Sequence, residues 1–137
     1  MPRLHVASVA NRLPEWAETA RAEYLGRMPR GYEVDLIEVR PAAARRLRAR
    51  LPSGVRIVAM DEHGNDLTTA QFAALLAEPT VFVIGPAGGL DPEIRQQAFL
   101  LLRLSALTLP HALAQVVLCE QLYRAATLLT GHPYHRK

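Results

Sequence analysis

The sequence contains a single cysteine, Cys119, so it has no disulfide framework and no pair of thiols for a metal site. The residues around this cysteine are apolar: Val116, Val117, Leu118 and Leu122. No neighbour in the sequence would lower the pKa of the thiol, and a free cysteine commonly behaves as a small apolar side chain. We therefore expect Cys119 to be a buried structural residue and not a nucleophile.

Long apolar runs are also absent. Runs such as 99–102 and 116–119 are far shorter than the ~20 residues of a membrane span, and the N-terminal M-P-R-L-H-V lacks the apolar core of a secretion signal. Half of the residues are apolar and 21% are charged, without low-complexity tracts or internal repeats. This composition predicts one folded domain over residues 1–137, located in the cytoplasm and without a membrane partner.

Several motifs for ligands and catalysis are missing. The sequence has neither the G-x-G-x-x-G spacing of dinucleotide sites nor the G-K-[ST] ending of a phosphate-binding loop. Ser105 and His111 could form a hydrolase pair, but the serine lacks the G-x-S-x-G elbow that would expose it. His132 and His135 are three residues apart, yet a zinc site needs three or four ligands and no further ligand lies at usable spacing. We therefore predict no metal.

What the sequence does contain is an alternation of short β-branched runs with longer amphipathic runs. This pattern predicts an α/β fold, with a mostly parallel sheet and helices on both faces. The expected strands are residues 4–10, 32–39, 55–60, 80–84 and 104–107. The continuously apolar run T-V-F-V-I, residues 80–84, is expected to be a central strand covered on both faces. The expected helices are residues 14–26, 42–51, 68–77, about 91–103 and 111–130, and residues 61–66 are expected to form a polar turn. Asp91 is expected to cap the helix that begins near it, with Pro92 as its first residue.

Three segments follow the ends of predicted strands, where open α/β sheets bind their ligands. They begin at Met60, Gly85 and Thr108. Glycine allows the backbone to approach a ligand without an intervening Cβ, and the N-terminus of a following helix favours a polar or anionic group. A plain tight turn at residues 85–89 is an equally acceptable interpretation of these residues alone.

Charged residues are concentrated in two places. The arginines Arg40, Arg45, Arg46, Arg48, Arg50 and Arg56 occupy a segment without an acid, although the net charge is only +3. Such a segment can contact phosphates or form a solvated helix face. Glu120 and Arg124 are four residues apart on a predicted helix, where they can pair, although most such pairs lie on the surface and carry no function.

Four stretches together are more specific than any one of them. They are F-V-I-G-P-A-G-G-L, L-S-A-L-T-L-P-H, L-C-E-Q-L-Y-R-A and H-P-Y-H-R-K, in this order. The chain resembles, over its whole length, the ribosomal RNA large subunit methyltransferase H family of the SPOUT superfamily. The resemblance implies S-adenosyl-L-methionine as cofactor, a C-terminal trefoil knot within about residues 80–137 and a homodimer. It also implies methylation of N3 of a pseudouridine in 23S rRNA, within the 70S ribosome.

The resemblance further implies site residues. The cofactor would lie among Met60, Gly85, Leu104, Ser105, Ala106, Leu107, Thr108 and Leu109. The catalytic candidates are Glu120, Arg124, His132, Tyr134, His135 and Arg136, the last three holding the target base from the other subunit. Methylation of N3 requires loss of a proton, for which His132 or His135 has a suitable intrinsic pKa, while Arg124 or Arg136 could stabilise the developing charge on oxygen.

The chain departs from the family pattern at three places. Pro86 stands where a second glycine is usual and Gly88 where an acid is usual, the segment 41–54 is shorter than in typical members, and Gly131 stands where asparagine is common. The altered glycine loop keeps open an alternative function, in which the fold is a catalytically inactive ribosome- or RNA-binding module.

Overall fold

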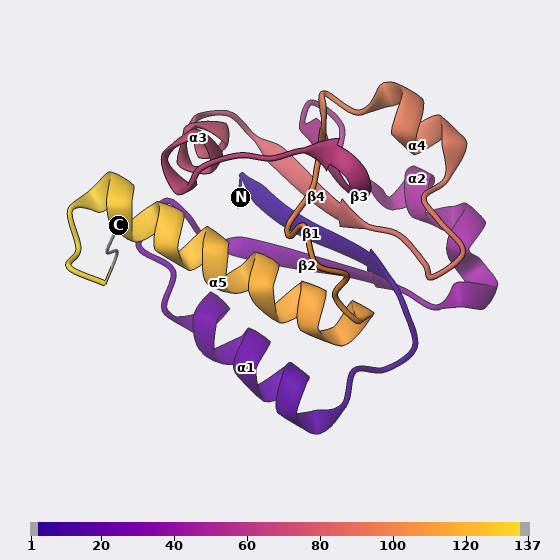
Figure 1. Cartoon of the computed structure of the whole chain (residues 1–137), viewed down its shortest axis with the longest axis horizontal. Coiled ribbons are helices and arrows are strands. Elements are labelled where there is room, and N and C mark those ends of the chain that lie inside the picture. Colours follow the sequence, from indigo (N-terminus) through magenta and orange to yellow (C-terminus); the bar gives the residue numbers. More distant parts are fainter. Residues whose placement is uncertain (1–2, 135–137) are drawn as a thin grey trace.

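A computed structural model of the protein describes residues 3–134 and consists of a parallel sheet covered by helices (Figure 1). The strands are β1 (Leu4–Val9), β2 (Val34–Val39), β3 (Arg56–Asn65), β4 (Thr80–Ile84) and β5 (Leu100–Leu102). They are ordered β2-β1-β4-β3-β5, and every neighbouring pair is parallel. The predicted α/β class is confirmed, and all five strands end at the same edge of the sheet.

Helices cover both faces of this sheet. They are α1 (Glu15–Gly26), η1 (Pro41–Arg46), α2 (Leu47–Arg50), α3 (Thr69–Ala74), η2 (Leu75–Ala77), α4 (Pro92–Gln97) and α5 (His111–Thr130). In Figure 1, α1 and α5 lie side by side on one face, and α3 packs against α5 on that face. Buried residues of α2 and α4, among them Leu47 and Ile94, pack against the other face.

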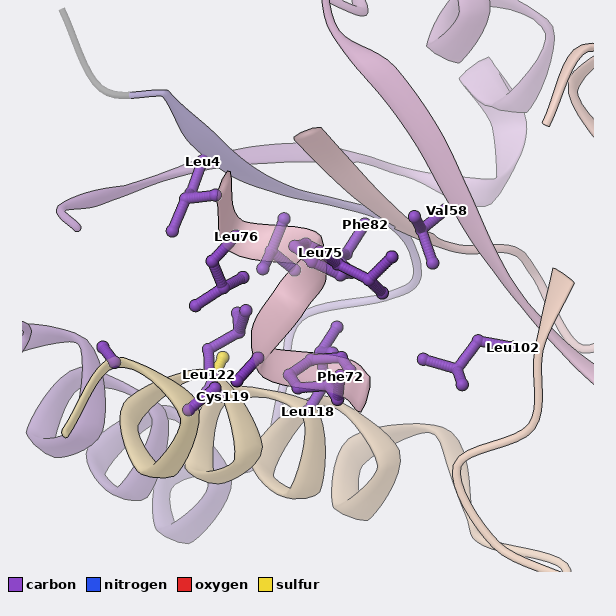
Figure 2. Packing of buried hydrophobic residues seen from close by; sticks show 14 of the residues in the cluster. Leu4, Val58, Phe72, Leu75, Leu76, Phe82, Leu102, Leu118, Cys119 and Leu122 are labelled. Carbon is purple, nitrogen blue, oxygen red and sulfur yellow. The ribbon is translucent and has the colours of Figure 1, made fainter. Parts of the chain in front are cut away.

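The central strand β4 shows why this sequence forms a two-faced core. All of its residues are buried, because the sheet is covered on both sides. Successive side chains point to opposite faces, so Phe82 packs with α3 and α5 while Val81 and Val83 pack with α2 and α4. Figure 2 shows Phe82 near Phe72, with the α5 residues lying beneath.

Cys119 lies on the buried side of α5, as predicted, with no exposed surface (Figure 2). Burial raises the pKa of its thiol to about 12, and the positive charge of nearby Arg21 opposes this rise only in part. Since the thiolate is the reactive form, this cysteine is chemically inert at neutral pH.

Two helix starts match the sequence signals. Thr68 Oγ1 accepts a hydrogen bond from the backbone N–H of Gln71 at 3.1 Å, and Gln71 Oε1 accepts one from the backbone N–H of Thr68 at 2.9 Å. This reciprocal capping box fixes the start of α3. Asp91 caps α4 through its bond from the Glu93 N–H, at 2.7 Å, and Pro92 is the first helical residue, as predicted.

The predicted polar turn at 61–66 is wrong, because β3 continues through Asn65. Residues Val58–Met60 pair with Leu100–Leu102 of β5, and after a register shift Asn65 pairs with Leu102 as well. Gly64 permits this close pairing: a Cβ there would lie 2.7 Å from the carbonyl carbon of Leu101. The polar residues of D-E-H-G-N-D therefore line the end of a strand and do not form a connecting turn.

The predicted fifth strand at 104–107 is also wrong. The strand is Leu100–Leu102, and the preceding helix ends at Gln97 instead of near Arg103. Ala98 has the extended conformation φ −64°, ψ 134°, which stops the helix. The Phe99 N–H then bonds to the carbonyl of Ile57, and the chain joins the free edge of β3. Residues 104–110 are left as a loop in front of α5.

The arginine-rich segment differs in type from its prediction. One helix was expected over 42–51, but the segment forms η1 followed by the single turn α2. Ala43 interrupts the helical conformation, with φ −109° and ψ 19°.

Two features are absent from residues 3–134. No helix of this part is long and apolar enough to cross a membrane. Within the same residues, no group of three or more His, Cys, Asp or Glu side chains could hold a metal ion.

Candidate active site

Two adjoining cavities lie at the carboxyl edge of the sheet, and both are lined by residues 60–63 at the end of β3. The β3–β5 cavity, of about 450 Å³, continues along the loop 104–109 to Ala114 of α5. The β3–β4 cavity, of about 360 Å³, continues along residues 84–87, 89 and 90 to Arg95 of α4. Volumes of roughly 300–1,000 Å³ are usual for small-molecule sites.

Every residue predicted to bind the cofactor lies on one of these cavities. Met60 lines both, and Gly85 lines the β3–β4 cavity. The β3–β5 cavity is lined by Leu104, Ser105, Ala106, Leu107, Thr108 and Leu109. The fold thus brings together three segments that are far apart in the sequence.

The loop after β4 turns tightly despite its proline. The Gly89 N–H donates to the carbonyl of Pro86 at 2.9 Å, and Gly89 has φ +109°, a conformation that favours glycine. A Cβ at Gly85 would lie 3.1 Å from the Cα of Leu90, so the loop folds back directly over this position. The departure at Pro86 therefore leaves a closed turn that still lines the cavity.

The loop 104–109 is anchored at its start. Arg103 donates two hydrogen bonds to the carboxylate of Asp66, at 2.7 and 2.6 Å, and its backbone N–H bonds to the Asn65 carbonyl at 2.9 Å. The hydrogen bond from Arg103 holds the pKa of Asp66 below its usual value. The end of β3 thus fixes the residue from which the loop departs.

Within residues 3–134, Ser105 and His111 make hydrogen bonds to other residues and not to each other. Ser105 Oγ accepts from the Leu107 N–H at 2.9 Å, inside the loop. The His111 Nε2 lies 2.9 Å from the Nε2 of Gln115. Burial lowers the pKa of His111. A hydrolase pair would require a serine–histidine hydrogen bond, so this arrangement gives that function no support.

Asp61 is a residue of the cavities that the sequence reasoning missed. Its side chain is only 7% exposed, forms an ion pair with Arg95 of α4 and borders both cavities. Its Oδ1 also accepts from the His63 N–H at 2.7 Å. The sequence signal was an acid directly after an apolar strand, but the expected turn at 61–66 hid its significance.

A second polar cluster begins in the middle of α5 and includes a residue that follows the helix. Arg124 donates to Glu120 Oε2 from Nε at 3.0 Å and from Nη2 at 2.7 Å, and the Tyr134 hydroxyl donates to the same oxygen at 2.9 Å. The Arg124 guanidinium lies 5.0 Å from the centre of the Tyr134 ring. The bond to Glu120 raises the pKa of Arg124. These three predicted catalytic residues thus form one connected group.

The tyrosine of this cluster gives a pH prediction. Burial, followed by the bond to Glu120, raises the pKa of Tyr134 to about 12 from its ordinary 10.0. Folding therefore favours the neutral phenol, so its stabilising contribution is complete below pH 10 and is lost as the pH rises toward 12. In an absorbance titration, Tyr134→Phe should lack a phenolate step near pH 12 that the wild type shows. If the step that the variant lacks lay at or below pH 10, the buried, hydrogen-bonded environment of Tyr134 would be contradicted.

The other predicted catalytic residues are more peripheral. His132 is exposed. Its Nδ1 accepts a hydrogen bond from the backbone N–H of Tyr134 at 3.1 Å, and its backbone N–H donates to the Thr127 carbonyl at 2.9 Å. His135 and Arg136 lie outside the described residues.

One chain does not bring the cluster to the cavities. At 1.5 Å per residue, Arg124 lies about 15 Å along the axis of α5 from Ala114, which lines the β3–β5 cavity. Figure 1 shows the loop entering α5 at one end and the residues that follow it at the other end. The predicted cofactor residues and the predicted catalytic residues therefore form two separate groups in a single subunit.

A family model described as "Predicted SPOUT methyltransferase" matches residues 2–135, almost the whole chain. The chain belongs to this methyltransferase family. Its relatives include a protein named ribosomal RNA large subunit methyltransferase H from Polynucleobacter asymbioticus. The two are 44% identical, over 98% of this chain and 99% of the relative. A protein of the same name from Paraburkholderia xenovorans is also 44% identical, over the same shares of the two chains. The resemblance inferred from the motifs is confirmed.

The fold is shared with solved SPOUT-type enzymes. The crystal structure of the SpoU methyltransferase AviRb from Streptomyces viridochromogenes, in complex with AdoMet, matches with a TM-score of 0.51 and 18% identity. The match covers 88% of this chain and 58% of that chain. At this identity the likeness concerns the fold alone.

Proposed function

We propose that this chain is an S-adenosyl-L-methionine-dependent methyltransferase that modifies N3 of a pseudouridine in 23S rRNA, on assembled 70S ribosomes in the cytoplasm. The observation that carries the proposal is the meeting of residues 60, 85 and 104–109 on two adjoining cavities. Two further findings support it. The relatives carry the name ribosomal RNA large subunit methyltransferase H, and AviRb was crystallised with AdoMet.

The lining of the cavities fits this cofactor. Leu104, Leu107 and Leu109 offer apolar contacts for a nucleoside base, and the glycine turn offers backbone groups that a Cβ does not shield. Asp61 pairs with Arg95, so its carboxylate offsets the positive charge that Arg95 would otherwise present to a cationic ligand. When bound, S-adenosyl-L-methionine supplies an electrophilic methyl group on a positively charged sulfur.

The residues of the second cluster would act on the target base. Removal of the N3 proton needs a base within hydrogen-bond reach, and the oxygens that gain charge need a donor. Arg124 can be that donor, because Glu120 fixes it and Tyr134 packs against it. His132 Nδ1 already accepts a hydrogen bond from the backbone N–H of Tyr134. In a neutral ring the proton therefore lies on Nε2. This favours His135 over His132 as the base, with Arg136 as a second cation.

The separation of cluster and cavities supports a composite site. If the cluster of one subunit reaches the cofactor of the other, a homodimer supplies what a single chain separates. The C-terminal trefoil knot, formed within residues 80–137, belongs to the same proposal. The alternative of an inactive RNA-binding module was motivated by Pro86 and Gly88, but the closed turn at these residues favours a functional cofactor site.

The deciding experiment is transfer of a labelled methyl group from S-adenosyl-L-methionine to 70S ribosomes that lack the modification, beside calorimetric titration of the cofactor. We expect incorporation that maps to N3 of a pseudouridine. Gly85→Val should weaken cofactor binding by about tenfold or more, because its side chain would crowd Leu90. Gly88→Ala is the matched control, since a Cβ there meets nothing within 4 Å. Binding without transfer would contradict the substrate, and absence of binding would leave only the RNA-binding module.

A further inference from the structure

The carboxyl edge of the sheet holds a third cavity, beyond the two that the proposed cofactor site uses. This β1–β2 cavity has a volume of about 240 Å³ and lies between the ends of β1 and β2. Its polar lining residues are Asn11, Arg12, Glu38 and Arg40. The volume is below the roughly 300 Å³ at which small-molecule sites begin, so the cavity suits a single group and not a whole nucleotide.

The strand order places this cavity in line with the other two. All strands are parallel, and β1 pairs directly with β4, which pairs with β3. Neighbouring strands are about 4.8 Å apart, so the ends of β1 and β3 lie on the order of 10 Å from one another along the same edge. The β1–β2 cavity is therefore a neighbour of the proposed methyl-donor site.

The charge around the β1–β2 cavity is positive. Arg12 and Arg40 are exposed. The ion pair between Arg12 and Glu18 is long, at 3.9 Å, and both side chains are well exposed. Glu18 therefore holds Arg12 only weakly. No ion pair involves Arg40 within the described residues. Arg50 reaches the rim as well, where its Nη1 donates to the backbone carbonyl of Glu38 at 3.0 Å.

The acid that lines the cavity is already engaged. The Glu38 carboxylate accepts from Arg21 Nη2 at 3.0 Å, and the Arg21 side chain is only 6% exposed. Arg21 is held in turn by a second bond, from its Nη1 to Gln115 Oε1 at 2.6 Å. Because Glu38 faces this buried partner, it offsets little of the charge of Arg12, Arg40 and Arg50.

The positive surface also connects to the proposed cofactor site. Arg48 forms an ion pair with Glu93 of α4, which ties the arginine-rich segment to the helix that carries Arg95. Arg95 lines the β3–β4 cavity. A polyanion that lies along the arginine-rich segment would therefore pass close to α4, the helix that contributes Arg95 to the β3–β4 cavity.

We infer that the β1–β2 cavity binds a backbone phosphate of the substrate RNA through Arg12, Arg40 and Arg50. The inference rests on the proposed function, because it names how that substrate is held. Guanidinium groups match phosphate oxygens in geometry and charge, and phosphate contacts fix the register of a nucleic acid on a protein. Arg12 and Arg40 are thus positioning residues, which place the target base over the cofactor cavity.

The test compares two double variants with the same loss of charge. Arg12→Gln with Arg40→Gln removes the cavity arginines. Arg27→Gln with Arg30→Gln removes two arginines that precede β2, at the opposite edge of the sheet. The cavity variant should raise the KM for 70S ribosomes by about fivefold to tenfold and lower the salt dependence of ribosome binding by about 1 to 1.5 in log–log slope. Its kcat and cofactor affinity should stay within about twofold of wild type.

Two outcomes would overturn the inference: equal effects of the two double variants, which would indicate unspecific charge, or no effect of the cavity variant. Failure of the proposed function would be distinguishable, because the wild type itself would then transfer no methyl group to ribosomes. Retained cofactor affinity in each variant verifies that the chain is folded.

Discussion

Arg124→Ala should lower the kcat of methyl transfer by about a hundredfold to a thousandfold, while cofactor affinity stays within about twofold of wild type. In the proposed mechanism the guanidinium stabilises charge that develops on the base only as the proton leaves. Two hydrogen bonds to Glu120, at 2.7 and 3.0 Å, hold it in place before the RNA arrives. Preorganised donors of this kind contribute strongly, because they need no reorganisation during the reaction.

The matched control for this substitution is Arg27→Ala. Arg27 pairs with Glu23 across one turn of α1, as Arg124 pairs with Glu120 across one turn of α5. Loss of this exposed pair should change kcat by less than about twofold. Equal losses in both variants would indicate that Arg124 only stabilises its helix.

Mixed dimers test whether the cluster acts across subunits. Gly85→Val weakens cofactor binding and Arg124→Ala impairs the cluster, so at a limiting cofactor concentration both homodimers should have little activity. In a composite site, the mixed dimer combines the intact cavity of one subunit with the intact cluster of the other. Coexpression should then restore about a quarter of wild-type activity, because about half of random dimers are mixed and each has one complete site. No restoration would contradict the shared site.

The family resemblance already implied a composite site, and the structure adds a separation within one chain that the sequence did not give. The sequence reasoning identified residues 104–109 and Tyr134 separately, without a distance between them. The loop 104–109 precedes α5, whereas Arg124 lies about 15 Å along the helix axis from Ala114. This separation supports the proposal that a second subunit completes the site.

The sequence predicted correctly those elements whose signals lie in a few consecutive residues. The run T-V-F-V-I predicted a buried central strand, and it forms β4. Asp91 with Pro92 predicted the start of α4. These signals need no information from distant residues, because burial on both faces and helix capping are properties of a few consecutive side chains.

The wrong predictions concern segments whose structure depends on pairing with residues far away in the sequence. Residues 100–102 and 104–107 are both short apolar runs, and periodicity cannot distinguish them. Pairing with Val58, Ala59 and Met60 of β3 selects Leu100–Leu102. The extension of β3 past Met60 makes Asp61 a buried cavity residue, although D-E-H-G-N-D has the composition of a turn.

Phe82→Ala should lower the free energy of unfolding by about 3–5 kcal/mol, a large part of the roughly 5–15 kcal/mol of a typical domain. Phe82 has no exposed surface and lies on the central strand, with its ring centre 5.5 Å from that of Phe72 (Figure 2). Removal of the ring leaves a cavity between the sheet and the helices α3 and α5, which the surrounding backbone cannot fill. Urea unfolding of the wild type and the variant at the same protein concentration measures the loss.

Phe99→Ala provides the comparison, since the same atoms are removed at the surface. Phe99 is 58% exposed, and its main contact is the Arg56 guanidinium, 4.3 Å from the ring centre. Loss of an exposed cation–π contact costs about 0.5–1 kcal/mol, well below the loss at Phe82. If the two variants lost equal stability, the face of the sheet that carries Phe82 would not be covered by α3 and α5. The cavities at its carboxyl edge would then lack the rigid support that the proposed chemistry requires, because a site on a loosely packed strand cannot hold its groups in place.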